Sequence, residues 1–316
     1  MTISETSDWL KARDSFLILT HRRPDGDTIG CAGALAQGLR ESGKTVYVLN
    51  NPEVTPRYLR FVKDYFAPDE YDPEYIVAVD IASGDLFPKN GCKYQHTVSL
   101  CIDHHPSNTL YAEHTCLEAA YASCGEIIYE ILVALSGNIS GKSAEHLYAA
   151  ITTDTGCFAF ANTTANTLQV ASQLIKAGAP HRELNRLLFR TKTRSRIKIE
   201  GAIFSGLEFY FDGAVAISII TREMIESTGA SEDDLDDIAS LPGVVDGVRA
   251  GITIREMTSP CNCKVSVRTS PSVNASAICE CFGGGGHSMA AGCTLQKTVP
   301  EVKAELLTVL EGFLTL

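Results

Sequence analysis

The sequence predicts an α/β protein in which a parallel-sheet domain is joined to a smaller α+β domain. In the first half of the 316-residue chain, short and almost continuously apolar runs alternate with segments of helical periodicity. Such runs are typical of strands that are buried on both faces of a parallel sheet. In the second half, four strand-like runs precede two helical segments, which indicates an α+β arrangement.

The first half is predicted to hold four strands and five helices. Ser123 is followed three residues later by Glu126, a capping-box pattern that predicts a helix start near Gly125. Ser143 is predicted to open the next helix. The strands are expected over 16–20, 45–50, 75–80 and 98–102, and the helices over 28–42, 125–135, 143–153, 165–177 and 181–189.

The second half is predicted to begin after a linker. Every second residue from Arg190 to Lys198 is basic, which we interpret as a solvated surface at the start of a partly helical linker; a role in guiding an anionic substrate stays open. The expected domains are 1–189 and 207–316, joined by the linker 190–206. Strands are predicted over 207–211, 214–220, 247–255 and 263–268, and helices over 274–281 and 299–314.

Composition restricts the classes of partner. The formal net charge is −11, whereas proteins that track long nucleic acids present a basic surface. A phosphate-bearing substrate is therefore expected to be short. No apolar run approaches the length of a membrane span, and the N-terminus lacks a signal-like core, so we expect no membrane partner. Eleven cysteines, an odd number, favour reduced thiols and a cytoplasmic location.

Asp and His residues gather in four separate segments, most of them directly after a predicted strand. Carboxylate oxygens and imidazole nitrogens suit divalent ions such as Mn²⁺. Because ligands gather at the carboxyl ends of parallel strands, we expect these side chains to meet in one pocket. The candidate metal ligands are His21, Asp25, Asp27, Asp80, His104 and Asp154.

These ligands are enough for two ions, and Asp80 can bridge them because it comes from a different strand. A water between two divalent ions is acidified enough to supply hydroxide near neutral pH, and this hydroxide can attack phosphorus in line. One ion is expected on His21, Asp25 and Asp80, and the other on Asp27, Asp80, His104 and Asp154.

Two further residues of the Asp103-His104-His105 run have expected catalytic roles. Asp103 is expected to orient a histidine without binding the metal itself. His105 is expected to contact the phosphate or to protonate the leaving oxygen. Taken singly, each of these residues fits a turn, a helix cap or a hydrogen-bonded structural position. Their occurrence in four segments favours the metal site.

A glycine-rich run, F-G-G-G-G-H-S-M-A-A-G, lies between the last two predicted helices. Four consecutive glycines cost backbone entropy and are hard to justify structurally. We interpret them as a loop whose backbone N–H groups approach an anion or a base edge. A merely flexible turn is the alternative.

Together these motifs resemble those of the DHH phosphoesterase superfamily. The resemblance rests on H-R-R-P-D-G-D-T-I-G, A-V-D, D-H-H-P-S-N and T-D-T-G-C-F, in this order. The run G-G-G-G-H-S-M-A-A-G is similar to the signature of the first type of DHH-associated C-terminal domain. The size resembles the short NrnA-type members, which degrade nanoRNA and often act on 3′-phosphoadenosine-5′-phosphate (pAp). Two departures are Cys31, where the family often has serine, and the lack of an arginine shortly after Asp80.

The resemblance implies two Mn²⁺ ions on the six ligands, with His105 near the scissile phosphate and an active site in the cleft between the domains. It also implies a homodimer. In the second domain it implies that Arg268 binds a phosphate and that a glycine loop holds the terminal nucleotide. The substrate-binding candidates are Arg268, Gly284, Gly285, Gly286, His287 and Asn274, with Arg249 as a further one.

The leading hypothesis is a manganese-dependent phosphodiesterase that trims short single-stranded oligonucleotides, such as pApA and pGpG, to mononucleotides. Activity as a pAp phosphatase or a cyclic di-AMP phosphodiesterase would use the same site. The non-enzymatic alternative is a nucleotide-binding sensor on an inactive scaffold, but such a scaffold would be expected to lose metal ligands. A RecJ-type nuclease is disfavoured by length and charge, and a family II pyrophosphatase by the glycine loop.

Overall fold

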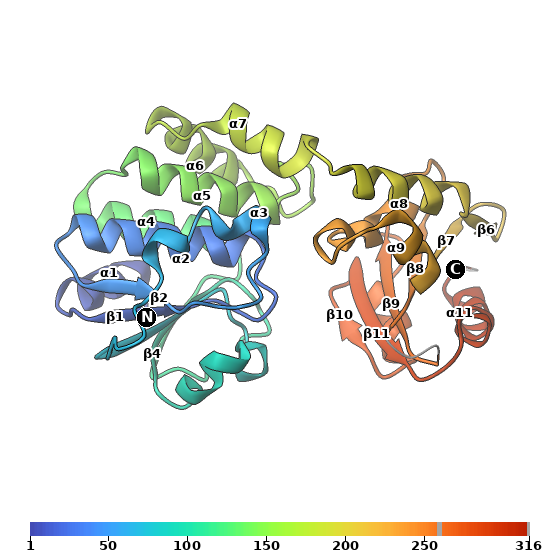
Figure 1. The fold of residues 1–316 in the computed structure, drawn as a ribbon, viewed down its shortest axis with the longest axis horizontal. Coiled ribbons are helices and arrows are strands. Elements are labelled where there is room, and N and C mark those ends of the chain that lie inside the picture. Colours follow the sequence, from blue (N-terminus) through green and yellow to red (C-terminus); the bar gives the residue numbers. More distant parts are fainter. Residues whose placement is uncertain (258–260, 315–316) are drawn as a thin grey trace. The chain divides into compact units, whose positions relative to one another are not determined.

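The chain divides into two compact units, Met1–Thr191 and Lys192–Leu316, each with its own sheet (Figure 1). The computed structural model describes residues 1–257 and 261–314. The first unit has a parallel sheet and the second a mixed sheet with helices, so the predicted α/β class is confirmed. The expected cleft between the two domains stays a prediction.

The first unit contains a five-stranded sheet in which all neighbouring strands are parallel. Its central strands are buried except at Tyr75 and Ser99, which are half-buried, in line with their apolar composition. The sequence predicts four of the five strands. It misses the edge strand, in which His114 and Thr115 are only half-buried. In spatial order the strands are β2 (Val46–Val48), β1 (Phe16–Leu19), β3 (Tyr75–Val79), β4 (Val98–Asp103) and β5 (His114–Leu117).

Helices cover one face of this sheet, and loops with short 3₁₀ turns cover the other (Figure 1). Alternate strand residues enter two cores: Ile18 and Val77 face the helices, whereas Leu17 and Ala78 face the loops. The helices are α1 (Ile3–Lys11), α2 (Gly26–Glu41), α3 (Pro56–Leu59), α4 (Cys124–Ser136), α5 (Gly141–Asp154), α6 (Ala165–Lys176) and α7 (His181–Asn185), which continues as a π-helical turn (Arg186–Arg190).

Helices α2 and α5 pack closely along a row of glycines. A Cβ atom at Gly26 would lie 2.4 Å from Thr153 Oγ1, and one at Gly30 would lie 2.5 Å from the carbonyl oxygen of His146. Only residues without a side chain allow this approach. The contact brings Asp154, the last residue of α5, beside the first turn of α2.

Two predicted helix starts differ from the structure. Helix α2 begins at Gly26, two residues before the predicted start, because the Asp25 side chain caps it by accepting from the backbone of Asp27 (3.0 Å) and Thr28 (3.2 Å). Helix α5 begins at Gly141, and its cap is Ser140 instead of the predicted Ser143.

The predicted capping box before α4 is wrong. Ser123 precedes the helix, but its side chain accepts no backbone N–H, and its hydroxyl is buried without a partner. Glu126 instead accepts hydrogen bonds from Asn166 (2.8 Å) and Thr167 (2.8 Å). The Glu126 side chain therefore makes a tertiary contact with the start of α6 instead of the helix cap that the local pattern predicts.

The segment 190–206, predicted as a linker, is largely helix α8 (Arg194–Ser205) of the second unit. Ile199 and Ile203 are fully buried in a core of that unit, which explains why this stretch is packed. Within the basic run, Arg196 pairs with Glu200, and Lys192 contacts the same carboxylate at 2.6 Å. The positive charge of the run is thus partly neutralised inside the unit.

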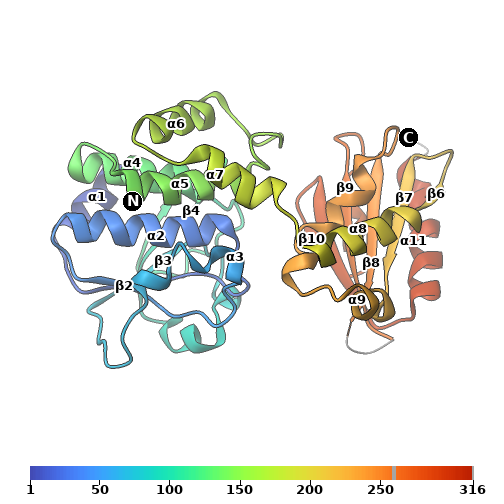
Figure 2. The ribbon, with the colours of Figure 1, turned by 45° about the horizontal axis from the view of Figure 1, so that its top comes forward.

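The second unit has a six-stranded mixed sheet between two layers of helices (Figure 2). The sequence predicts four of these strands and misses two, one inside the glycine-rich run and one that begins at its end. The remaining helices are α9 (Arg222–Thr228), α10 (Ala275–Glu280) and α11 (Val299–Leu314). In spatial order the strands are β10 (Gly285–Gly286), β11 (Ala290–Leu295), β9 (Cys263–Thr269), β8 (Ala250–Glu256), β7 (Val215–Ile220) and β6 (Glu208–Tyr210).

Two findings concern the cysteines and the expected lack of membrane segments. All eleven cysteines are free thiols. Among the described residues, no helix combines the length and apolar character that a membrane crossing requires.

Candidate metal centre

The six predicted ligands lie together at the carboxyl edge of the first sheet. His21 follows β1, Asp80 follows β3 and His104 follows β4, three strands that are neighbours in the sheet. The other three belong to helix ends. Asp25 and Asp27 stand at the start of α2, and Asp154 ends α5. The edge that parallel strands share explains why residues so far apart in sequence meet here.

One cluster consists of His21, Asp25 and Asp80. The Nε2 atom of His21 lies 3.6 Å from an Asp25 oxygen and 3.8 Å from an Asp80 oxygen. Asp25 is the most open of the three, with 55% of its side chain exposed, whereas 3% of the Asp80 side chain is exposed. One ligand atom from each lies within 4.8 Å of the others, a spacing that a single ion could span.

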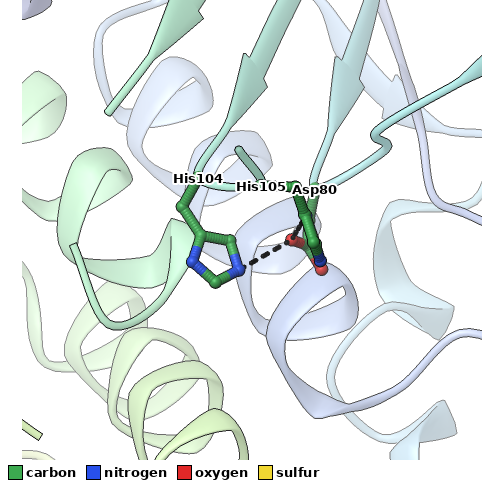
Figure 3. Close-up of side chains that lie close together, drawn as sticks. All are labelled: Asp80, His104 and His105. Carbon is green, nitrogen blue, oxygen red and sulfur yellow. Dashed lines mark ion pairs between the residues drawn. The ribbon is translucent and has the colours of Figure 1, made fainter. Parts of the chain in front are cut away.

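A second cluster consists of Asp27, His104 and Asp154. The Nε2 atom of His104 lies 3.9 Å from Asp27 Oδ2 and 3.6 Å from Asp154 Oδ2. It also lies 3.6 Å from the second oxygen of Asp80, as Figure 3 shows. Asp80 therefore presents one oxygen to each cluster, and His105 comes within 3.4 Å of it as well.

Backbone carbonyl groups orient both ligand imidazoles. The Nδ1 atom of His21 lies 2.8 Å from the carbonyl oxygen of Arg22, and Nδ1 of His104 lies 3.2 Å from that of Tyr121. Since a carbonyl oxygen only accepts, Nδ1 carries the proton in each ring. Nε2 is left as the electron-pair donor that faces the carboxylates.

The N-terminus of α4 holds Asp27. Its two carboxylate oxygens accept hydrogen bonds from the backbone of Cys124 (2.8 Å) and Gly125 (3.0 Å). The buried thiol of Cys31 also donates to Asp27, at 3.4 Å. Gly125 is required at this place, because a Cβ there would lie 2.8 Å from Ala150 and 3.3 Å from the Asp27 carboxylate. Cys31, the departure noted in the sequence, thus contacts a candidate ligand.

Asp103 is fully buried and orients His105. It accepts from His105 Nδ1 at 2.8 Å and from the Asn108 amide at 2.6 Å. Burial acts to raise the pKa of Asp103, but these hydrogen bonds outweigh it and hold the pKa below its ordinary value. The carboxylate in turn outweighs burial at His105 and raises the pKa of that imidazole. The pair is suited to keep a proton on His105 near neutral pH.

Electrostatics show that this pocket suits cations. Burial and neighbouring carboxylates raise the pKa of Asp27 and Asp80 well above the ordinary range, and the same causes raise the pKa of Asp154 to about 7. Burial, followed by the neighbouring His105, lowers the pKa of His104 to about 4. Buried carboxylates this close together need positive charge to be ionised together.

A further observation supports a metal at Asp80. Its Oδ1 atom is buried without a hydrogen-bond partner, and its backbone is left-handed, with φ of 58°. Both features are costly for a buried aspartate and are typical of functional sites. The oxygen and imidazole donors fit divalent ions such as Mn²⁺ or Mg²⁺. The residues present therefore fit the group that the sequence predicts.

In the second unit, the predicted substrate residues gather at one end of the sheet. Arg268 of β9 pairs with Ala290 of β11, and His287 opens the tight turn that connects β10 to β11. The Ser288 carbonyl of this turn accepts from the backbone of Ala275, at the start of α10. Asn274 caps α10 by accepting from Ala277 at 3.1 Å, so its side chain already has a structural partner.

The glycine run has structural reasons that the sequence analysis did not anticipate. A Cβ at Gly284 would lie 2.3 Å from the carbonyl oxygen of Gly292, and one at Gly286 would lie 2.6 Å from that of Ala290. Gly283 has a φ of 72°. Gly285 is the one glycine of the run with neither a steric contact at an added Cβ nor a positive φ. Close packing explains Gly284 and Gly286, and the left-handed backbone explains Gly283, so the expectation that the run is hard to justify structurally was wrong for three of the four glycines.

Comparison with known proteins identifies the family. Residues 15–151 match the model of the DHH family N-terminal domain, and residues 213–316 match the DHHA1 domain. A relative from Thermus thermophilus, the bifunctional oligoribonuclease and PAP phosphatase NrnA, is 33% identical over 88% of this chain and 83% of its own length. The chain belongs to the DHH family. It is therefore a phosphoesterase, with a DHH domain followed by a DHHA1 domain.

Solved structures agree with this two-domain fold. An exopolyphosphatase-related protein from Bacteroides fragilis superposes with a TM-score of 0.85 at 23% identity, covering 98% of this chain and 94% of that one. RecJ from Thermus thermophilus in complex with Mn²⁺ superposes with a TM-score of 0.58 at 13% identity, covering 98% of this chain and 54% of RecJ. The DHH and DHHA1 domains of this chain thus share their fold with these proteins.

Several groups that build the DHH site were missed from the sequence. The carbonyls of Arg22 and Tyr121 and the amides of Cys124 and Gly125 are backbone groups, which carry no sequence signal. Asn108 could have been found, since it is a polar residue in the same motif as Asp103.

Proposed function

We propose that this chain, a nucleotide phosphoesterase by family, uses divalent metal ions to cleave short oligonucleotides to mononucleotides. One observation carries the proposal. Asp80 turns one oxygen toward the His21 cluster and the other toward the His104 cluster, so two ions could share this carboxylate. The NrnA relative from Thermus thermophilus, whose name includes oligoribonuclease, supports the substrate class.

The chain's own residues would hold the ions and the substrate. We assign one ion to His21, Asp25 and Asp80, and the other to Asp27, Asp80, His104 and Asp154. Two divalent ions, when bound, supply an acidified water at neutral pH and stabilise charge on phosphoryl oxygens. The Arg22 and Tyr121 carbonyls keep Nε2 of each imidazole free for this purpose. Mn²⁺ is the expected ion, supported by the RecJ complex.

His105 would donate a proton to the leaving oxygen. Its Nδ1–H is held by Asp103, and the raised pKa of the imidazole favours the protonated form near neutrality. An imidazolium at this place would also stabilise negative charge on the phosphoryl group. Asp103 would act through His105, as a positioning residue.

The DHHA1 domain would bind the far end of the substrate. Arg268, with its planar guanidinium, suits bidentate contact with a phosphate. Gly285 is exposed with open space around it, and His287 lies in the neighbouring turn. Gly284 and Gly286 would act by shaping the hairpin, and Asn274 by capping α10.

Purified protein with Mn²⁺, a labelled pApA and a much longer oligomer tests this proposal. We expect rapid conversion of pApA to AMP, much slower cleavage of the long oligomer and loss of activity with a chelator. Equal cleavage of both lengths would contradict length selection. No cleavage of either with any divalent ion would contradict the function.

A second activity on pAp is supported by the other half of the relative's name, PAP phosphatase. Release of inorganic phosphate from pAp would establish it. Cyclic di-AMP belongs in the same substrate panel, because its cleavage uses the same chemistry. A homodimer and a cytoplasmic location stay predictions, and light scattering of the purified protein tests the first.

A further inference from the structure

We propose that Phe160 is a stacking platform for a nucleobase of the substrate, beside the metal centre. This inference rests on the proposed function, since it concerns a nucleotide whose phosphate lies over the Asp and His clusters. It adds a base-binding residue to the DHH domain, whereas the residues predicted from the sequence to hold the nucleotide all lie in the DHHA1 domain.

The position of Phe160 carries the first step. Asp154 ends α5, and the chain then forms the loop that contains Phe160. The ring folds back over Gly156, where an added Cβ would lie 2.5 Å from two ring carbons. Gly156 lies two positions after Asp154, so their Cα atoms are at most about 7 Å apart. An aromatic ring is thus held within a short reach of a candidate metal ligand.

The loop is rigidly built. The Asn162 side chain donates to the carbonyl oxygen of Asp154 at 3.1 Å and to that of Ala122 at 3.0 Å. The backbone N–H of Phe160 donates to the Thr155 carbonyl at 3.0 Å. Because these bonds tie the loop to the metal ligand and to the segment before α4, a bound base would cost little ordering entropy.

Backbone strain points in the same direction. Three consecutive residues have positive φ, namely Gly156 at 55°, Cys157 at 56° and Phe158 at 69°. Left-handed backbone costs free energy at residues other than glycine, and such strain is typical of sites where it fixes a functional geometry. Here Phe160 is 51% exposed, while Phe158 packs against the core.

The chemistry of the ring identifies the occupant. Successive bases stack on aromatic side chains in proteins that bind single-stranded nucleic acids, and stacking tolerates any base because every base has a π-face. Phenylalanine offers no hydrogen bond with which to choose among bases. We therefore expect stacking without base selectivity. Apolar stacking also suits a chain with net charge −11, which offers little long-range attraction to phosphates.

Kinetics with matched variants test the inference. Phe160→Ala is expected to lower kcat/KM on pApA by roughly 5- to 150-fold, the range measured for one lost base stack. Phe160→Tyr should retain activity, and Phe160→Leu should lose most of it although it keeps an apolar side chain. Phe209→Ala is the control, since Phe209 is 50% exposed on β6 of the other unit. Equal kcat/KM for Phe160→Ala and the parent protein would overturn the inference.

A binding experiment gives a readout besides activity. The chain has one tryptophan, Trp9, which is buried, so Phe160→Trp introduces an exposed reporter. Titration with AMP should quench its fluorescence, whereas ribose 5-phosphate, which lacks the base, should not. Equal responses to both probes, or none to AMP in a variant that still cleaves pApA, would overturn the stacking. If the parent protein cleaves no nucleotide, the proposed function fails instead.

Discussion

The two domains differ in how far folding alone explains their candidate site residues. In the DHH domain, Asp80 is buried with one oxygen that accepts no hydrogen bond, and its backbone is left-handed; both features weaken the fold unless a cation is bound. In the DHHA1 domain, Asn274 caps a helix, and Gly284 and Gly286 allow a tight hairpin. A residue that destabilises the fold points to a functional role. A residue that stabilises the fold is explained by that stabilising role alone, so its presence says nothing about function.

The largest expected effect comes from Asp80→Asn. Asparagine tolerates the left-handed backbone, so the variant removes charge without strain. We expect kcat/KM on pApA to fall by about 1000-fold, because both clusters lose a shared carboxylate. The metal-free protein should become more stable by about 1 kcal/mol, since burial and neighbouring carboxylates penalise ionisation of Asp80 and a neutral amide avoids this cost. Asp64→Asn, on the exposed surface, is the control for urea unfolding and activity. If the metal-free Asp80→Asn variant were less stable than the metal-free parent protein, Asp80 would not be costly to the fold, and the contrast between the two domains would be wrong.

The next effect concerns His105. His105→Asn is expected to lower kcat by about 100-fold through loss of the general acid. The pKa of His105 is raised, so the proton is present at low and neutral pH and is lost as pH rises through that value. The parent profile of kcat against pH should therefore fall on the alkaline side, and the variant should lack this limb. An unchanged alkaline limb in the variant would assign it to another group.

Adjacent glycines sharpen the comparison within the DHHA1 domain. Gly284→Ala should reduce the free energy of unfolding by about 2 kcal/mol, because its methyl group would collide with the Gly292 carbonyl. Gly285→Ala has open space and should leave stability nearly unchanged. Urea denaturation of both variants measures this difference. A higher KM on pApA for Gly285→Ala, with normal stability, would show binding by the loop; equal destabilisation of both would contradict the structural explanation.

The smallest expected effect is at Asn274. Asn274→Ala removes the cap of α10 and should cost about 1 kcal/mol of stability. Asn274→Asp keeps a capping oxygen and should restore stability. If Asn274→Asp is stable but binds pApA poorly, the asparagine has a role beyond the cap.

Much of the DHH site could be predicted because strand ends are visible in sequence. Apolar runs locate the strands, and the parallel topology then places the residues that follow them, such as His21, Asp80 and His104, at one edge. The pairing of Asp103 with His105 also follows from proximity along the chain. The capping box at Ser123 failed because Glu126 binds α6, a partner that is distant in sequence. The segment 190–206 is partly helical, as expected, but its apolar residues pack within the second unit, a tertiary contact that the local pattern does not show.

The sequence by itself determined most of the strands and helices and the chemical types of the candidate ligands, since hydrophobic periodicity and side-chain chemistry are local properties. Only the tertiary structure decided which atoms meet. In the folded protein, one Asp80 oxygen faces each cluster, and backbone carbonyl groups orient the imidazoles of His21 and His104. Strand β11 also fills the space around Gly284 and Gly286. These outcomes depend on contacts between distant segments, which form only when the chain packs.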